Sequence, residues 1–288
     1  MAYPRFSLSV TFIAILTTIF CISGILAVLH NLAVLLVVRN IHSLRSTARY
    51  FMASLAAAEL LSGFTGNLHF ALNHSRKESI NLGTESAVFC FTTTSVTLSL
   101  SNVALDRYIA ITSPLQYHNR MTSARCLILI MFSWCFAVLG ATTIYLVPEQ
   151  NLIQIWICQA IIAVPIPFWV IAFCYFRIYQ ATKTSFPVRD NITEAQQIAE
   201  NKRQRKTANT FVIITGLFIL LFMPSFIYDC VFVANPPDLS DVKSGSSSRK
   251  VWIALVAISY FSAVLDPWVY AIRMRDFRMA LKELFRCT

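Results

Sequence analysis

Seven mostly apolar stretches, separated by short polar connections, take up nearly the whole of this chain. A helix that crosses a lipid bilayer needs about 20 consecutive, largely apolar residues, and each of the seven stretches reaches that length. We therefore predict an all-α membrane protein, a seven-helix bundle that occupies residues 1–272. The predicted helices lie at about 8–38, 47–72, 84–112, 124–147, 152–181, 205–234 and 250–272.

The composition agrees with a chain that lies mostly within a bilayer. Charged residues make up 13% of the sequence and hydrophobic residues 56%, whereas soluble domains contain about 25% charged residues. The first apolar stretch is too long for a removable signal peptide, and neither a basic start nor a small-residue cleavage site accompanies it. We expect it to remain as a signal-anchor helix.

The basic residues are distributed unevenly over the connections. Lys and Arg are held on the cytoplasmic side when a membrane protein inserts, and an extracellular N-terminus places most of the 24 Lys and Arg residues inside the cell. We attribute the net charge of +10 to this topology and to anionic lipid of the inner leaflet, and not to nucleic acid. The basic residues left outside are Arg5, Arg76, Lys77, Lys243, Arg249 and Lys250.

Two motifs with ionisable residues lie near the inner ends of apolar stretches. Asp-Arg-Tyr at 106–108 ends the third stretch, and Asp-Pro-Trp-Val-Tyr at 266–270 lies near the end of the seventh. Ionisable residues at such depth in a membrane are costly and usually functional. In this setting the motifs resemble those of the rhodopsin-like (class A) G-protein-coupled receptors, and the resemblance extends from about residue 31 to residue 285.

The resemblance implies a plasma-membrane receptor that passes the signal of an extracellular ligand to a heterotrimeric G protein, with arrestin as a further partner. In the family the Asp106–Arg107 pair restrains the inactive state, and the arginine meets the G protein when the sixth helix swings outward. Gln204-Arg205-Lys206 stands where the sixth helix often supplies an acidic partner, so we expect a weak or missing ionic latch and raised basal activity. The resemblance assigns the switch to Asp106, Arg107, Tyr108, Tyr175, Asp266, Pro267 and Tyr270.

A second polar set lies in the first, second and seventh stretches. Asn31, Glu59 and Asp266 match positions that meet in a watery core in the family. Buried carboxylates need partners, because an unpaired charge in a medium of low dielectric constant is costly. The family has Asp at the position of Glu59 and usually Asn at that of Asp266. Two acids at close range tend to share a proton, which disfavours the sodium ion that the resemblance implies here, and we expect no other cofactor.

The sixth stretch keeps the family's hinge. Phe218, Phe222 and Pro224 follow the aromatic-then-proline pattern, with Phe222 in place of the usual tryptophan. A proline within a membrane helix kinks the helix and frees a backbone carbonyl group. Trp134 in the fourth stretch and Pro167 in the fifth also match the family's landmarks.

Three positions narrow the class of ligand. Tyr260 stands where opsins have the lysine that binds retinal, which excludes covalently held retinal, and Phe89 replaces the amine-binding aspartate, which disfavours a monoamine. Leu82 replaces the cysteine that usually ties the third helix to the second outer loop. The missing disulfide and the very short second outer loop are similar to the melanocortin branch and its adenosine, cannabinoid and lysolipid relatives, but the acidic cluster of melanocortin receptors is not reproduced.

Acidic and aromatic residues remain near the predicted outer mouth. Acidic groups above an aromatic floor suit a small cationic ligand or the basic end of a peptide; the alternative is that the acids only solvate the helix ends. His69, Glu149 and Phe232 are nearby. The residues that we predict to bind the ligand are Glu85, Phe89, Phe222, Phe226, Asp229 and Tyr260.

Residues 273–288 form a separate C-terminal segment. Apolar residues recur there at helical spacing opposite most of the basic ones, which predicts a short amphipathic helix along the inner leaflet. Cys287 follows at a position typical of reversible palmitoylation, and an unmodified cysteine is the alternative. Asn73 begins a glycosylation sequon in the predicted first outer loop.

No group of residues in the sequence predicts catalysis or a metal site. Cys90, Cys158 and Cys230 lie in the outer halves of their stretches, which leaves one disulfide open. Two rival interpretations remain beside the receptor. One is a receptor-like protein that associates with another receptor without signalling; the other is a small transporter or channel, which requires a continuous polar path.

Overall fold

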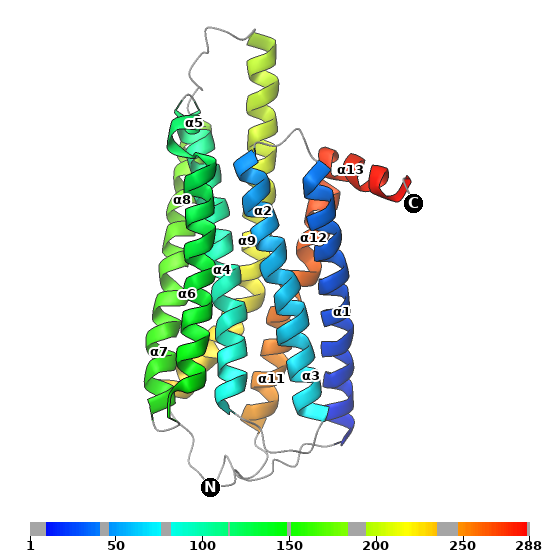
Figure 1. Ribbon diagram of the computed structural model, residues 1–288, viewed down its shortest axis with the longest axis vertical. Helices are drawn as coiled ribbons and strands as arrows, with labels where there is room; N and C mark the ends of the chain where they lie inside the picture. The colour runs from blue at the N-terminus through cyan, green and yellow to red at the C-terminus, as the bar shows by residue number, and fades with distance from the viewer. Residues whose placement is uncertain are drawn as a thin grey trace.

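The computed structural model describes residues 10–40, 46–75, 82–114, 116–148, 151–183, 194–234 and 247–286. These residues form a bundle of long helices with one shorter helix lying across an end (Figure 1). The described residues include no strand, so the predicted all-α seven-helix bundle is confirmed. In chain order its helices are α1 (Val10–Asn40); α2 (Ser46–Leu61), η1 (Ser62–Asn67) and α3 (Leu68–Ser75); α4 (Leu82–Thr112); α6 (Ser123–Leu146); α7 (Leu152–Ala163) and α8 (Pro165–Lys183); α9 (Glu194–Ala234); and α11 (Ser247–Tyr260) and α12 (Ser262–Arg273).

Three of the seven bundle helices are interrupted, where the sequence predicted continuous helices. The second contains the π-helix η1, where Gly63 packs so closely on α1 that an added Cβ would lie 2.8 Å from the Cβ of Ala27. The fifth is interrupted at Val164, because Pro165 has no N–H group to continue the helical hydrogen bonds. The seventh is interrupted at Phe261, between α11 and α12.

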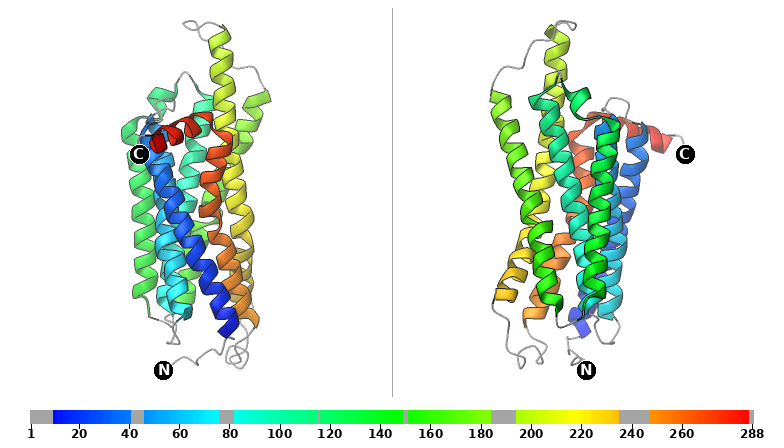
Figure 2. Two further views of the ribbon diagram at one scale, coloured as in Figure 1. Left: turned by 90° about the vertical axis from the view of Figure 1, so that its right-hand side faces the viewer. Right: turned by 60° about the vertical axis from the view of Figure 1, so that its left-hand side comes forward.

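The sixth bundle helix, α9, is the longest, with 41 residues. It extends beyond its neighbours at one end of the bundle (Figure 2). The sequence predicted a start near residue 205, but the helix begins at Glu194 because residues 194–204 contain good helix formers and neither glycine nor proline. Pro224 lies within the membrane-spanning part of α9.

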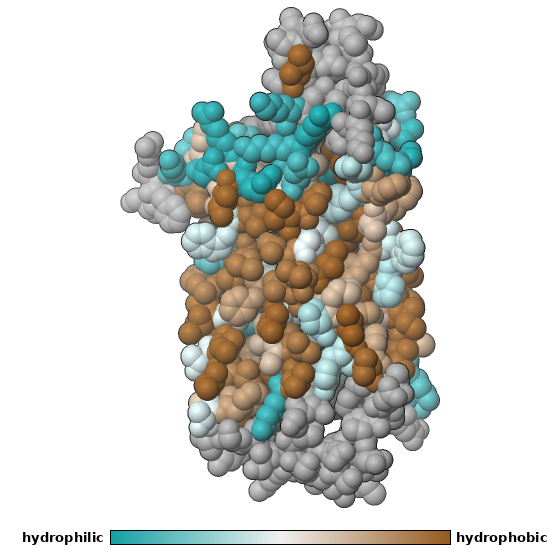
Figure 3. Space-filling view, turned by 180° about the vertical axis from the view of Figure 1, so that it is seen from behind, coloured by the Kyte–Doolittle hydropathy of each residue, from teal (hydrophilic) through white to brown (hydrophobic). Residues whose placement is uncertain are grey.

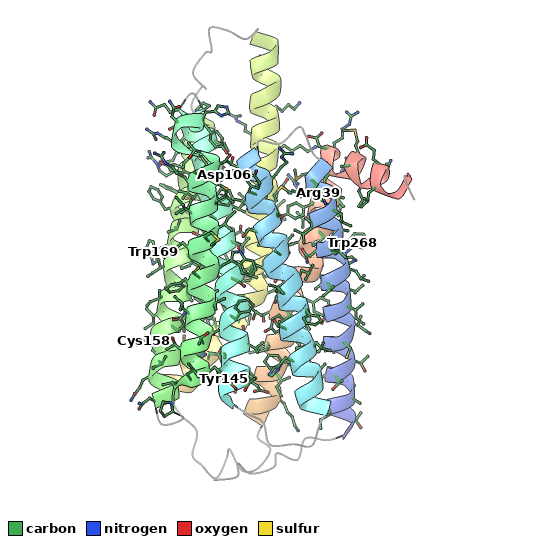
Figure 4. The ribbon with its side chains drawn as sticks, viewed as in Figure 1. Arg39, Asp106, Tyr145, Cys158, Trp169 and Trp268 are labelled. Carbon is green, nitrogen blue, oxygen red and sulfur yellow. The ribbon has the colours of Figure 1, made fainter. Side chains whose placement is uncertain are left out.

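The face of the bundle seen in Figure 3 is apolar across its middle. Six of the described helices are long and apolar enough to cross a membrane, and α4 is the most enclosed of them. Side chains such as Trp169, which is 77% exposed, and Trp268 point away from the bundle (Figure 4). Such exposure of large apolar groups fits a protein surrounded by lipid.

One end of the bundle is rich in hydrophilic residues. Hydrophilic residues gather at the end from which α9 projects, where Arg39 and Asp106 lie (Figures 3 and 4). The one-turn helix α5 (Tyr117–Arg120) and the amphipathic helix α13 (Arg275–Arg286) also lie at this end. We call it the Arg107 end and the opposite end the Asp229 end.

Candidate functional site

Asp106 and Arg107 form a buried ion pair at the Arg107 end of α4. Arg107 donates from Nε to Asp106 Oδ2 at 3.0 Å and also from its terminal Nη2. The side chains of Asp106 and Arg107 are 1% and 3% exposed. The structure therefore brings these two predicted switch residues together in a largely dry environment, where charge–charge interactions are stronger than in water.

The second carboxylate oxygen of Asp106 is bound from α5. Tyr117 donates from its hydroxyl to Asp106 Oδ1 at 2.6 Å, and the same hydroxyl forms a hydrogen bond with Thr47 of α2. Burial and the nearby Asp106 carboxylate raise the pKa of the Tyr117 phenol, because both disfavour a phenolate. Both oxygens of Asp106 thus have donors, and α2, α4 and α5 are joined at this point.

Arg107 is also in contact with the sixth bundle helix. Its guanidinium carbon lies 5.8 Å from the ring centroid of Phe211 on α9. The Phe211 ring in turn meets Tyr270 of α12 at 5.9 Å, edge to face. Among the described residues Arg107 has no acidic partner other than Asp106, and the side chain of Gln204 lies outside them.

Two further predicted switch residues, both tyrosines, lie at contacts between helices. The Tyr175 hydroxyl on α8 forms a 3.2 Å hydrogen bond with Thr215 on α9. Tyr108 on α4 packs edge-on against Phe173 of α8, with ring centroids 5.8 Å apart. Pro267 is buried within α12. The predicted switch residues therefore come from α4, α8 and α12, and Arg107, Tyr175 and Tyr270 contact the part of α9 that carries Phe211 and Thr215.

The predicted polar core lies at the junction of α1, α2 and α12. Glu59 and Asp266 are both buried and close enough for their charges to interact, and Tyr270 is near both. None of the four carboxylate oxygens has a well-formed hydrogen bond among the described residues. Asn31 does not bridge the acids directly; its amide donates to the carbonyl of Ala263 on α12 at 2.8 Å.

Aromatic side chains form a continuous column next to the predicted hinge in α9. Phe218 and Phe222 stack at 5.3 Å, and Phe226 continues the stack at 6.0 Å from Phe222. Phe168 on α8 meets Phe218 and Phe222 edge-on, and Phe89 on α4 stacks on Phe222 at 6.3 Å. Movement at this point of α9 must therefore reorganise rings that belong to three bundle helices.

Three of the predicted ligand residues, Phe89, Phe222 and Phe226, belong to this aromatic column, and Asp229 lies farther along α9 toward the Asp229 end. Trp252 of α11 donates from Nε1 to Asp229 Oδ1 at 2.7 Å, and its ring lies 6.5 Å from Phe89. Asp229 Oδ2 is buried without a hydrogen-bond partner among the described residues. Glu85 is buried on α4 one turn from Phe89, and a role of these two acids in ligand binding stays a prediction.

Tyr260 forms the floor of this region on the side of the seventh bundle helix. Its hydroxyl forms a 3.1 Å hydrogen bond with Thr92 of α4, and its ring lies 6.1 Å from Phe70. A neighbouring cavity of about 20 Å³, lined by Phe89, Trp156 and Phe222 among others, holds little more than one water molecule. A ligand larger than a water molecule must displace side chains to enter this cavity.

Some contacts of the site were not predicted from the sequence, and some predictions lie outside the described residues. Phe211, Trp252 and Tyr117 were missed; Phe211 alone carried a signal, since it precedes Phe218 by about two helical turns and so shares its face. Cys90, Cys158 and Cys230 are all free thiols, so the possible disulfide is not formed. The side chains of Asn73, Glu149 and Phe232, and the whole of Cys287, lie outside the described residues.

The sequence of this chain is similar to those of known proteins over most of its length. A sequence model described as 7 transmembrane receptor (rhodopsin family) matches residues 30–154 and 148–270. Melanocortin receptor 4 of Danio rerio is 26% identical to this chain, over 94% of the chain and 84% of the relative. Octopamine receptor beta-2R of Chilo suppressalis is 28% identical, over 94% and 79%. Adenosine receptor A2a of Homo sapiens is 25% identical, over 91% and 70%.

Proposed function

This chain belongs to the rhodopsin family of 7 transmembrane receptors, and from that premise we propose that it couples an extracellular ligand to a heterotrimeric G protein at the plasma membrane. The named relatives are receptors and not enzymes, and this chain likewise is not an enzyme. The observation that carries the proposal is the enclosure of Arg107 between Asp106 and the ring of Phe211, which lies near the middle of α9. Such a buried arginine becomes available to a partner only when α9 moves.

The distribution of charge supports the orientation of the receptor. The Arg107 end carries Arg39, Arg273 and the basic face of α13, and Lys and Arg are retained on the cytoplasmic side during insertion. The Arg107 end is therefore cytoplasmic in this proposal, and the N-terminus is extracellular. The G protein, and arrestin after it, bind at this end between the displaced α9 and the rest of the bundle.

The proposed mechanism is an equilibrium between a closed and an open bundle. The ligand rearranges the aromatic column at the Asp229 end, α9 pivots near Pro224, and its Arg107 end swings outward. Because the ligand and the G protein both bind the open state more tightly, each raises the affinity of the other by the same factor. No group within the bundle needs to react for this linkage to work.

The proposed ligand carries a positive charge, as a small organic cation or as the basic end of a peptide. Asp229 supports this, because the residue is only 8% exposed and one of its carboxylate oxygens has no partner among the described residues. The rings of Phe89 and Trp252 beside it provide faces that attract cations. The relatives are named for melanocortin, octopamine and adenosine, so their names favour no single ligand.

The C-terminal segment is proposed to rest on the inner leaflet. Helix α13 lies across the end of the bundle (Figure 1), with Phe277 buried 5.8 Å from the ring of Tyr270 and Arg275 and Arg278 exposed. This arrangement suits contact with anionic lipid. Palmitoylation of Cys287 would strengthen that contact, and Asn73 is the proposed site of N-glycosylation.

The experiment that tests the proposal needs no ligand. Cells expressing the receptor and a panel of G-protein activation sensors are compared with cells expressing Arg107→Ala at equal surface level. A basal signal that the variant abolishes supports the proposal and identifies the G protein. If neither protein signals, the same cells are exposed to a library of organic cations and basic peptides. Silence throughout that library would favour a receptor-like partner that does not signal.

A further inference from the structure

Among the described side chains of α9, Phe211 alone contacts both Arg107 and Tyr270 through its ring. Its side chain is 1% exposed, and its ring lies 5.8 Å from the guanidinium carbon of Arg107 and 5.9 Å from the ring of Tyr270. Arg107 belongs to α4 and Tyr270 to α12. A single aromatic residue thus connects the helix that moves with two helices that carry the family's motifs.

The ring of Phe211 gives the guanidinium of Arg107 a second contact, in addition to the carboxylate of Asp106. Asp106 binds the guanidinium on one side and is itself occupied by Tyr117 on the other. A guanidinium within about 6 Å of an aromatic ring centroid is attracted to the ring face, and the attraction is strongest when water is excluded. Both partners are almost wholly buried, so the contact is of the desolvated kind.

We infer that Phe211 is the latch of the resting receptor: its ring holds α9 over Arg107 and takes the place of the acidic residue that is absent at Gln204. This inference rests on the proposed function. Outward movement of α9 withdraws the ring from Arg107 and Tyr270 together, which frees the arginine for the G protein. The latch is aromatic and buried, so salt screens it far less than a surface ion pair.

The test replaces Phe211 by phenylalanines with one, two and three ring fluorines, introduced by codon suppression. Fluorination weakens the attraction of the ring for a cation while leaving its shape almost unchanged. We expect basal G-protein signalling to rise stepwise with the number of fluorines, by roughly tenfold over the series. The matched control is the same series at Phe51, which is also 1% exposed but lies on α2 and belongs to neither the hinge nor the switch, and a flat response is expected there.

A second measurement reports on α9 itself. An environment-sensitive fluorescent amino acid at Ile198, which is 60% exposed on the projecting part of α9, is followed in purified receptor without G protein. We expect its signal to shift stepwise with fluorination of Phe211. A flat response of both signals over the series would overturn the latch, because it would mean that only the size of the ring matters.

The two measurements separate the latch from the proposed function. A shift at Ile198 without signalling through any G protein would support the latch and count against coupling to G proteins. A rise in signalling without a shift at Ile198 would overturn the latch, because Phe211 would then act by touching the G protein. A similar dependence on fluorination at Phe51 would also overturn it.

Discussion

Trp252 on α11 donates a 2.7 Å hydrogen bond from its indole Nε1 to Oδ1 of Asp229 on α9. The two residues lie on consecutive bundle helices at the Asp229 end, and the indole ring also packs against Phe70 and Phe89. This bond fixes the position of the carboxylate at the Asp229 end of the aromatic column. The second carboxylate oxygen of Asp229, Oδ2, has no donor among the described residues. A cationic ligand would bind most favourably at this oxygen.

Asp229→Asn tests the charge without removing the hydrogen bond, because the amide oxygen of asparagine still accepts from Trp252. We expect the potency of a cationic agonist found in the library to fall about thirtyfold or more, since loss of one member of a buried charge pair costs about 2 kcal/mol or more. Surface expression and basal signalling should remain unchanged. Equal potency on both receptors would show that Asp229 only solvates the end of α9.

Tyr117→Phe removes the hydroxyl that joins Asp106 to Thr47. We expect thermal stability to fall by the equivalent of about 1 to 3 kcal/mol, because Asp106 Oδ1 is left buried without its donor. Basal signalling should rise, since Arg107 is then held by a less firmly placed carboxylate. Thr47→Val is the control: it removes the other partner of the same hydroxyl and should have the smaller effect on signalling.

The pH dependence of this stability difference follows from the pKa of Tyr117. Burial and Asp106 raise it above the ordinary value of 10.0, so the stabilisation is complete below that ordinary value and is lost as the pH rises through the raised one. The difference in melting temperature between the wild type and Tyr117→Phe should therefore be constant from about pH 6 to about pH 9. A difference that disappears within this range would contradict the assigned hydrogen bond.

The polar core gives a prediction about sodium. If Glu59 and Asp266 share a proton, the core holds too little negative charge to bind a cation, and replacing sodium chloride by choline chloride should leave the melting temperature unchanged. Asp266→Asn leaves Glu59 as the one acid in the core and matches the family's usual pattern at that position. We expect sodium to stabilise this variant. A clear effect of sodium on the wild type would show that both carboxylates ionise.

The elements that were predicted from sequence share a simple physical origin. Long apolar stretches can be recognised by composition alone, and Asp106 and Arg107 are adjacent in the chain, so their pairing needs no knowledge of the packing of other helices. The contact of Trp252 with Asp229 depends on the relative rotation of α9 and α11, which helical periodicity does not determine. The π-helix near Gly63 likewise reflects the approach of α1, which is a property of the packed bundle.

Gly66→Ala tests the packing of the floor beneath the ligand region. An added Cβ at Gly66 would lie 2.6 Å from the ring of Tyr260, and that ring cannot easily withdraw, because it is buried and its hydroxyl is bound to Thr92. Overpacking of this kind costs about 1 to 3 kcal/mol, so we expect a lower melting temperature. Gly216→Ala is the matched control, because nothing lies within 4 Å of its added Cβ and alanine favours a helix by about 1 kcal/mol. The control should be as stable as the wild type or more so; a Gly66→Ala receptor that behaves like the control would mean that Tyr260 is free to move.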